Sequence, residues 1–192
     1  MDSPLNRFRL ELLRVLSGAV GLSPEAYNTV EAICLRLEQQ GDLSPLTLKT
    51  SPLHDILQQV KQSYPSLPVG LHSLAESFFN IADSLSWYKR PAPGMEDFTA
   101  GHANADIIGP RGLVVRDDIQ VGVTLMRPGL TYPDHHHLPE EVYIVLSEGF
   151  WRQSNNAWHS PGPGGFVYNP ADIVHSMRSV DTPLFALWCL KL

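Results

Sequence analysis

The stretch "TYPDHHHLPEEVYIVL", residues 131–146, places three histidines, two glutamates and two tyrosines before or within an apolar run. Imidazole nitrogens and carboxylate oxygens are the ligands through which proteins bind zinc and other first-row divalent metals. Neighbouring side chains of an extended strand point to opposite faces, so His135 and His137 share one face and His136 points away. Two imidazoles on one wall can therefore bind the same metal ion.

The metal site needs two further ligands, and the sequence offers one carboxylate and one more imidazole. After the bend at the proline that follows the histidines, Glu141 and Tyr143 again share a face. His175, in "DIVHSM", lies among apolar neighbours, where an imidazole without a partner would be costly. Three neutral imidazoles and one carboxylate suit a divalent ion of Zn, Fe, Mn, Co or Ni. The predicted metal ligands are His135, His137, Glu141 and His175.

The elements that must position these ligands fall into two parts, of which the first is helical. From residue 5 onward, apolar residues recur at the spacing of one helix face. The segment "SPEAY" has the form of a helix start, with Ser23 as the capping residue and Pro24 at the first helical position. We predict about four helices in residues 1–95, which either pack on the following part of the chain or form a dimer.

After the Pro-rich connector "KRPAPGMEDF", the period of the apolar residues falls to two. Turn-forming Gly, Pro, Asn and Asp separate short strand candidates. Strands at this spacing are typical of a β-sandwich or a small barrel, so residues 96–192 are predicted to form a β-barrel that carries the metal site. The segments are "GLVVRDD", "QVGVTLMRPG", "EEVYIVLSEG", "GGFVYNP", "DIVHSMRS" and "PLFALWCLKL".

Composition limits the class of protein. Of the 192 residues, 43% are hydrophobic and 18% are charged, which is ordinary for a globular chain. The net charge of -6 and the lack of a basic stripe argue against a nucleic-acid partner and against a polybasic membrane patch. Charges run through the first apolar stretch, as in an amphipathic helix and unlike a signal peptide. We expect a cytoplasmic protein that binds neither nucleic acid nor membranes.

The predicted ligands lie within two stretches that resemble the two motifs of the cupin family. Two residues of the second stretch depart from the usual pattern, because Asp172 stands where Gly is usual and Ser179 stands where Asn is usual. The resemblance implies a mainly β fold, in which a cupin (jelly-roll) β-barrel follows the helices. The matching residues are Gly129, His135, His137 and Glu141 in "GLTYPDHHHLPEE", and Gly164, Pro170 and His175 in "GGFVYNPADIVHSMRS".

Tyr132 and Tyr143 flank the ligand cluster, and both are candidates for acid–base catalysis. A divalent cation stabilises a nearby phenolate, which can then remove a weakly acidic proton from carbon. Together with the helical first part, this arrangement resembles the cupin-type bacterial lyases of dimethylsulfoniopropionate, most closely the Q-type enzyme. The likeness is strongest across "TYPDHHHLPEEVYIVLSEG" and "PADIVHSM". It implies that Tyr143 is the catalytic base and that Tyr132 contacts substrate or metal.

The resemblance also implies the reaction and the substrate. The carboxylate of the zwitterionic substrate would bind the metal, Tyr143 would remove an α-proton, and dimethyl sulfide would leave acrylate behind without any organic cofactor. A sulfonium cation is attracted to aromatic faces by about 0.5–2 kcal/mol each. The aromatic residues on or near the predicted strands that could line its pocket are Trp151, Tyr168 and Trp188.

Two other functions fit the same ligands. One is an Fe(II)-dependent cupin dioxygenase of a small substrate, for which turnover should consume oxygen. The other is a non-catalytic ligand-binding cupin, in which the helices serve as an interaction module. The latter predicts ligand binding without turnover and no effect of replacing Tyr143 by Phe.

Overall fold

The computed structural model describes residues 3–45 and 47–192. Within them, eight strands form one large sheet in the order β1-β4-β3-β5-β11-β7-β9 with β2 paired to β3, and three form a small sheet in the order β6-β10-β8. The strands are β1 (Asp42–Leu43), β2 (Trp87–Tyr88), β3 (His102–Ile108), β4 (Val114–Val115), β5 (Ile119–Met126), β6 (Thr131–His135), β7 (Glu140–Val145), β8 (Phe150–Gln153), β9 (Phe166–Asn169), β10 (His175–Arg178) and β11 (Leu184–Lys191).

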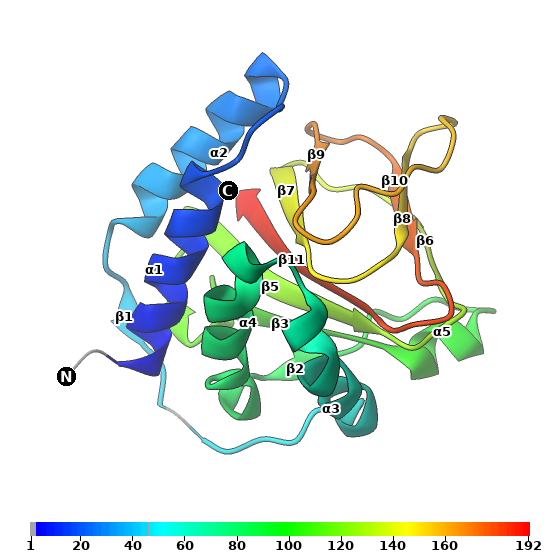
Figure 1. Ribbon diagram of the computed structural model, residues 1–192, viewed down its shortest axis with the longest axis horizontal. Helices are drawn as coiled ribbons and strands as arrows, with labels where there is room; N and C mark the ends of the chain where they lie inside the picture. The colour runs from blue at the N-terminus through cyan, green and yellow to red at the C-terminus, as the bar shows by residue number, and fades with distance from the viewer. Residues whose placement is uncertain (1–2, 46) are drawn as a thin grey trace.

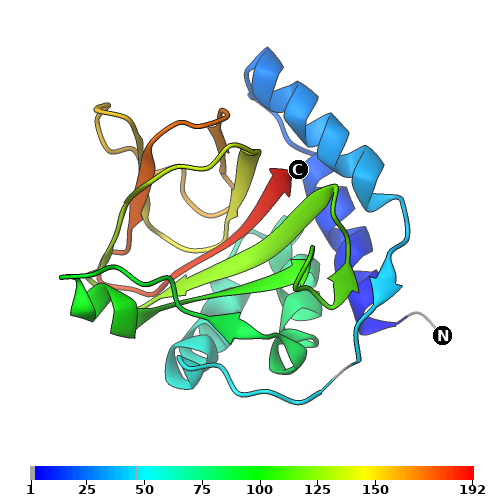
Figure 2. The same ribbon diagram turned by 180° about the vertical axis from the view of Figure 1, so that it is seen from behind.

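The helices precede the strands of the small sheet in the sequence, and most of them lie on one side of the large sheet, whereas the short helix at residues 96–101 lies near the small sheet (Figure 1). Seen from behind, β3, β5 and β11 run side by side across the molecule (Figure 2). The helices are α1 (Pro4–Ser17), α2 (Pro24–Leu37), α3 (His54–Ser63), α4 (His72–Phe79) and α5 (Glu96–Gly101), with 3₁₀ turns η1 (Tyr64–Ser66), η2 (Val69–Leu71) and η3 (Ala82–Ser84).

Two of the helices begin at serine caps of the same kind. The Ser3 side chain accepts a hydrogen bond from the Asn6 amide at 3.1 Å, and the Ser23 side chain accepts one from the Ala26 amide at 3.2 Å. In both, a proline occupies the first turn, where its missing N–H costs nothing. The predicted start of the second helix is therefore confirmed.

Strand alternation divides the hydrophobic residues between two clusters. In β7, Val142 and Ile144 pack against the helices, whereas Tyr143 and Val145 face the small sheet. The same division holds in β11, where every second residue joins the helical side. One face of the large sheet thus forms a core with the helices, and the other face forms the interior between the two sheets, where the predicted ligands lie. The helix-facing residues of β11 are Phe185, Leu187 and Cys189.

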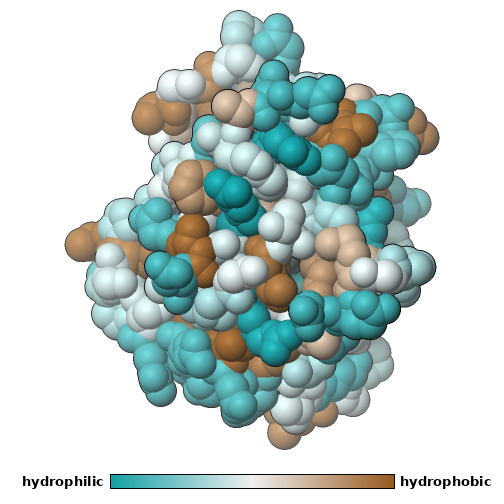
Figure 3. Space-filling model, turned by 90° about the vertical axis from the view of Figure 1, so that its right-hand side faces the viewer, coloured by the Kyte–Doolittle hydropathy of each residue, from teal (hydrophilic) through white to brown (hydrophobic). Residues whose placement is uncertain are grey.

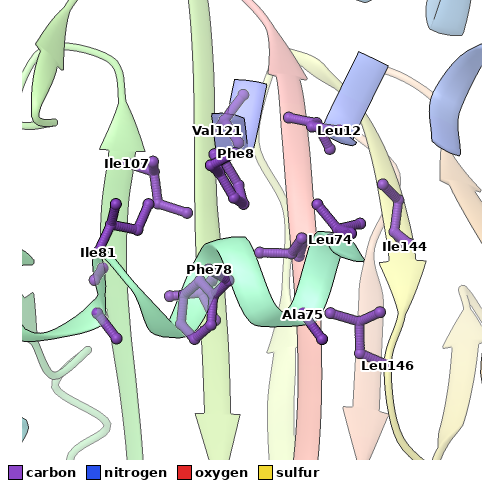
Figure 4. Packing of buried hydrophobic residues seen from close by; sticks show 14 of the residues in the cluster. Phe8, Leu12, Leu74, Ala75, Phe78, Ile81, Ile107, Val121, Ile144 and Leu146 are labelled. Atoms are coloured by element: carbon purple, nitrogen blue, oxygen red, sulfur yellow. The ribbon is translucent and has the colours of Figure 1, made fainter. Parts of the chain in front are cut away.

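The core on the helical side is closed by aromatic packing. Figure 4 shows Phe78 of α4 and Phe8 of α1 pointing toward the sheet, with Val121 of β5 nearby. The Phe78 ring lies 5.1 Å from that of Phe185 between ring centroids, and its side chain is fully buried. Burying a side chain of this size contributes about 1.5–3 kcal/mol. Since this core joins helices and sheet, the helices are part of the support of the strands.

The fold confirms the prediction of a mainly β architecture preceded by helices. Among the described residues, no strand of the small sheet pairs with a strand of the large one, so the sheets face each other and do not close into a ring. Strands from both predicted regions pair with each other, because Asp42 pairs with Val115 and Trp87 with Ala105. The division into regions 1–95 and 96–192 stays a prediction.

The surface is a mixture of polar and apolar residues. Figure 3 shows the side of the molecule formed by α5 and the small sheet, where hydrophobic residues occur as separate patches among hydrophilic ones. None of the helices in residues 3–45 and 47–192 is long and apolar enough to cross a membrane.

The helical core yields a stability prediction. Replacing Phe78 by Ala should lower the free energy of unfolding by about 3–5 kcal/mol, because the cavity left under α4 cannot fully collapse. Urea denaturation followed by circular dichroism measures the change. The control is Leu35→Ala on α2, where a side chain that is 59% exposed should cost no more than about 0.5 kcal/mol. Equal effects of the two changes would contradict this account of the core.

Candidate metal centre

The four predicted ligands meet between the two sheets. Pairing of β10 with β6 places His175 opposite His135, and the centroids of their rings are 4.0 Å apart. His137 lies in the turn after β6, and Glu141 lies on β7. Oε2 of Glu141 is 3.4 Å from Nε2 of His137 and 3.3 Å from Nε2 of His175. The ligating atoms of His137, Glu141 and His175 all lie within 4.8 Å of one another, and His135 stands beside them.

The three imidazoles are held in the orientation that metal binding requires. In each, Nδ1 lies 2.9 Å from a backbone carbonyl oxygen, that of Pro133, Pro139 or Ile173. A carbonyl only accepts hydrogen bonds, so Nδ1 carries the proton and Nε2 of the neutral ring keeps its lone pair. Within the described residues, Nε2 of His175 is buried and has no hydrogen-bond partner. An orphaned lone pair beside a carboxylate fits a bound cation.

The charge of the centre resides on Glu141. Its side chain is 3% exposed, and Oε2 accepts a hydrogen bond from the Asn169 amide at 2.8 Å. Burial alone would raise the pKa of Glu141, but the adjacent imidazoles of His137 and His175 lower it to about 2. Burial, together with the charge of His175, lowers the pKa of His135 to about 3. The centre therefore offers one carboxylate and at least one neutral imidazole near neutral pH.

The first departure from the cupin motif is accommodated by the backbone. Asp172 has a φ of 60°, the left-handed conformation that glycine adopts without strain, which explains why Gly is usual there. Aspartate is among the few other residues that tolerate this conformation. The Asp172 amide donates to the His137 carbonyl at 2.9 Å, and its carboxylate lies 2.6 Å from Nδ1 of His136. His136 thus points outward and supports the turn that carries His137.

At the second departure, Ser179 stabilises a turn of the backbone through its side chain. The Ser179 hydroxyl accepts a hydrogen bond from the Leu130 amide at 2.9 Å and donates to the Arg127 carbonyl at 2.7 Å. It thereby closes the turn between β5 and β6, a task within the reach of a longer Asn side chain. Neither departure replaces a predicted ligand.

A cavity of about 360 Å³ opens onto the centre and holds both predicted catalytic tyrosines. Tyr143 is 2% exposed and Tyr132 is 4% exposed. Burial and the Glu141 carboxylate raise the pKa of Tyr143 well above its usual value. Burial also raises the pKa of Tyr132, whereas hydrogen bonds from Asn104 and the charge of Arg90 oppose the increase. A positive charge in the centre would therefore be needed to stabilise a phenolate at Tyr143.

Of the four aromatics predicted to contact substrate, Tyr132 and Trp188 line the cavity. The Trp188 ring lies across Gly122, where an added Cβ would approach Trp188 Cζ2 to 2.2 Å, so this strand position requires glycine. Trp151 and Tyr168 do not line the cavity. Trp151 is buried in the interior behind Tyr143, with ring centroids 6.3 Å apart. Tyr168 points the other way along β9, and its hydroxyl donates to Glu140 at 2.6 Å.

Sequence reasoning missed several residues of the site. Asn104 lies on β3, "HANADII", which was not predicted as a strand because its helix-facing residues include two small alanines. The alternation of Ala with polar residues was the available signal. Arg90 lies in the loop after β2 and lines the cavity. Its backbone amide donates a hydrogen bond to Nε2 of His102 at 2.8 Å. Thr124 lines the same cavity from β5.

The sequence is similar to known lyases. A family model described as dimethylsulfoniopropionate lyase matches residues 27–186. The dimethylsulfoniopropionate lyase DddQ of Ruegeria pomeroyi is 28% identical over 130 residues, which cover 66% of this chain and 65% of that protein. The putative dimethylsulfoniopropionate lyase DddL of Cereibacter sphaeroides is 27% identical over 112 residues, covering 58% and 47%. The matched segments therefore span less than two thirds of the length of these relatives.

Two solved structures share the fold over nearly the full chain. The crystal structure of the lyase DddQ from Ruegeria pomeroyi gives a TM-score of 0.73 at 20% identity, covering 100% of this chain and 93% of that one. A chain from the crystal structures of the lyases RdDddP and RnDddQII gives 0.75 at 19% identity, covering 98% and 92%. This likeness establishes the fold, which is the expected cupin with N-terminal helices. Because the family model spans most of the sequence, the chain belongs to the dimethylsulfoniopropionate lyase family.

Proposed function

We propose that this chain is a metal-dependent lyase that cleaves dimethylsulfoniopropionate to dimethyl sulfide and acrylate. The observation that carries the proposal is the position of Tyr143, buried in one cavity with Glu141, His135 and His137, in a chain of this family. The names of the similar lyases supply the substrate. The reaction needs a base beside a site that binds a carboxylate, and this cavity combines the two.

The metal is proposed to be one divalent ion, drawn from Zn, Fe, Mn, Co and Ni. Its ligands would be His135, His137, Glu141 and His175. The ligating atoms of the last three lie within 4.8 Å of one another, and the His135 ring lies 4.0 Å from that of His175 between centroids. Bound there, such an ion supplies Lewis acidity toward the substrate carboxylate and increases the acidity of the adjacent α-protons. The fixed Nδ1 hydrogen bonds of the histidines orient the rings in advance.

The chain's own residues would then carry out a β-elimination. Tyr143 lies two residues after Glu141 on the same face of β7, in the cavity that would hold the substrate carboxylate. As phenolate, it takes one α-proton. The electron pair of that C–H bond forms the double bond of acrylate, and the bond from the β-carbon to sulfur breaks with its electrons. Dimethyl sulfide leaves as a neutral molecule.

The cavity also offers groups for the two charged ends of the substrate. The Trp188 ring, fixed across Gly122, presents an aromatic face for the sulfonium cation. Arg90 lines the cavity and attracts the carboxylate end. Tyr132 lines the same cavity, and its ring lies 4.6 Å from that of His135 between centroids.

The direct test is release of dimethyl sulfide. Purified protein is incubated with dimethylsulfoniopropionate without oxygen, with and without a chelator, and the headspace is analysed by gas chromatography. The proposal predicts release that stops on chelation and returns when a divalent ion is added back. Turnover that requires oxygen would contradict it and favour an oxygenase.

Replacing Tyr143 by Phe should lower kcat by about 10²–10⁴-fold, the usual contribution of a positioned base. The bound metal, measured by plasma emission spectroscopy, should be unchanged, because the ring still fills its place. The matched control is Tyr27→Phe on α2, where the tyrosine is 57% exposed and far from the chemistry. Full activity of the Tyr143 variant would remove this residue as the base.

Replacing His175 by Ala should abolish stoichiometric metal binding, since it removes the ligand whose Nε2 is buried without a partner. The stabilisation that added metal gives wild type, about 2.7 kcal/mol at 100 times Kd, should be lost with it. Thermal denaturation with and without zinc measures this. His54→Ala is the matched control, because His54 is exposed at the start of α3 and belongs to no part of the centre. Wild-type metal content in the His175 variant would mean that another residue is the ligand.

A further inference from the structure

A chain of hydrogen bonds runs along the floor of the cavity and ends at Tyr132. The Trp188 indole N–H donates to the Thr124 hydroxyl oxygen at 3.2 Å, and the Thr124 hydroxyl donates to Oδ1 of Asn104 at 2.7 Å. Nδ2 of Asn104 lies 3.3 Å from the Tyr132 hydroxyl oxygen. All four side chains are at most 6% exposed and line the same cavity.

The hydrogen bonds from Trp188 to Tyr132 can run in only one direction if every hydrogen is to have an acceptor. An indole nitrogen can only donate, so Thr124 must accept from Trp188. The single Thr124 hydrogen then goes to Oδ1 of Asn104. If the amide were turned over, this hydrogen would have no acceptor within the described residues. The amide of Asn104 is thus fixed with Nδ2 toward Tyr132, and it donates to the tyrosine.

The second polar neighbour of the Tyr132 hydroxyl is also a donor. Arg90 lines the same cavity, and its guanidinium has no acceptor atom. Its positive charge opposes the rise that burial causes in the pKa of Tyr132. Among the described residues, none accepts the Tyr132 proton. The Tyr132 hydroxyl oxygen therefore accepts a hydrogen bond from Asn104, and its own hydrogen is available to a ligand in the cavity.

We infer that Asn104 and Thr124 are positioning residues that make Tyr132 a hydrogen-bond donor to the carboxylate of the bound substrate. The inference rests on the proposed lyase function and divides the work between the two tyrosines. Tyr143, two residues after Glu141 on the same face of β7, takes the proton, whereas Tyr132 donates to the oxygens on which charge accumulates as the α-proton leaves. A donor fixed in advance at such a position stabilises the transition state.

The Asn104→Asp variant tests the direction of these hydrogen bonds. A carboxylate can only accept, so it would take the Tyr132 proton away from the cavity. We expect kcat to fall about 10²-fold, as in Tyr132→Phe, because one donor to the developing charge is lost. The double variant should be no slower than either single variant. Losses that multiply in the double variant would overturn the inference.

Two uncharged variants of Thr124 separate the effect of hydrogen-bond direction from the effect of the charge that Asn104→Asp adds. Thr124→Val keeps the shape but removes the hydroxyl, which frees the Asn104 amide to turn over and accept from Tyr132. Its kcat should fall at least about tenfold, the least that a hydrogen bond to a charged group contributes. Thr124→Ser keeps the hydroxyl and should restore the rate. Equal rates for the Val and Ser variants, at equal Tm, would overturn the inference.

Binding of acrylate gives a measurement that needs no turnover. Titration calorimetry of the metal-loaded protein should show acrylate binding about tenfold weaker in Thr124→Val and Tyr132→Phe than in wild type and Thr124→Ser. If wild type releases no dimethyl sulfide but shows this pattern, the proposed function fails while the carboxylate-binding role of Tyr132 stands. If wild type is an active lyase and all four proteins bind acrylate equally, the inference fails alone.

Discussion

The arrangement of this protein depends on the alternation of side chains along β7. Two adjacent carboxylates, Glu140 and Glu141, point to opposite faces of the large sheet. Glu140 accepts hydrogen bonds from Thr29 of α2 and Tyr168 of β9 and pairs with Lys191. Glu141 faces the histidines. One strand therefore joins the helical layer to the metal centre, so the helices help to hold the strand that carries a ligand and the base.

Burial sets the electrostatics of the cavity. A carboxylate that is almost fully enclosed is costly unless it is hydrogen-bonded and paired with positive charge. Asn169 supplies a hydrogen bond to Glu141, and the neighbouring imidazoles supply lone pairs once their Nδ1 atoms are bound to the backbone. The set is complementary to a cation. The same cation would offset the burial that raises the pKa of Tyr143.

The two tyrosines of the cavity differ in their partners and not in their burial. Tyr143 stands beside an acceptor, Glu141, whereas Tyr132 stands beside donors, Asn104 and Arg90. Opposite hydrogen-bond environments suit opposite tasks, one tyrosine handling a proton and the other stabilising negative charge. This difference arises from β3 and β5, the strands that form the cavity floor.

The sequence by itself determined the mainly β fold behind N-terminal helices, because periodicity and caps are local properties of the chain. It also predicted the ligand set, since His135 and His137 are close in sequence and His175 lies in a recognisable motif. Only the tertiary structure decided which aromatics reach the cavity, because strand parity turns Tyr168 to the helical side of the large sheet, and Trp151 packs in the interior beside Tyr143 without lining the cavity. Asn104 and Thr124 emerged in the same way. Their role depends on strand neighbours distant in sequence, which no local pattern records.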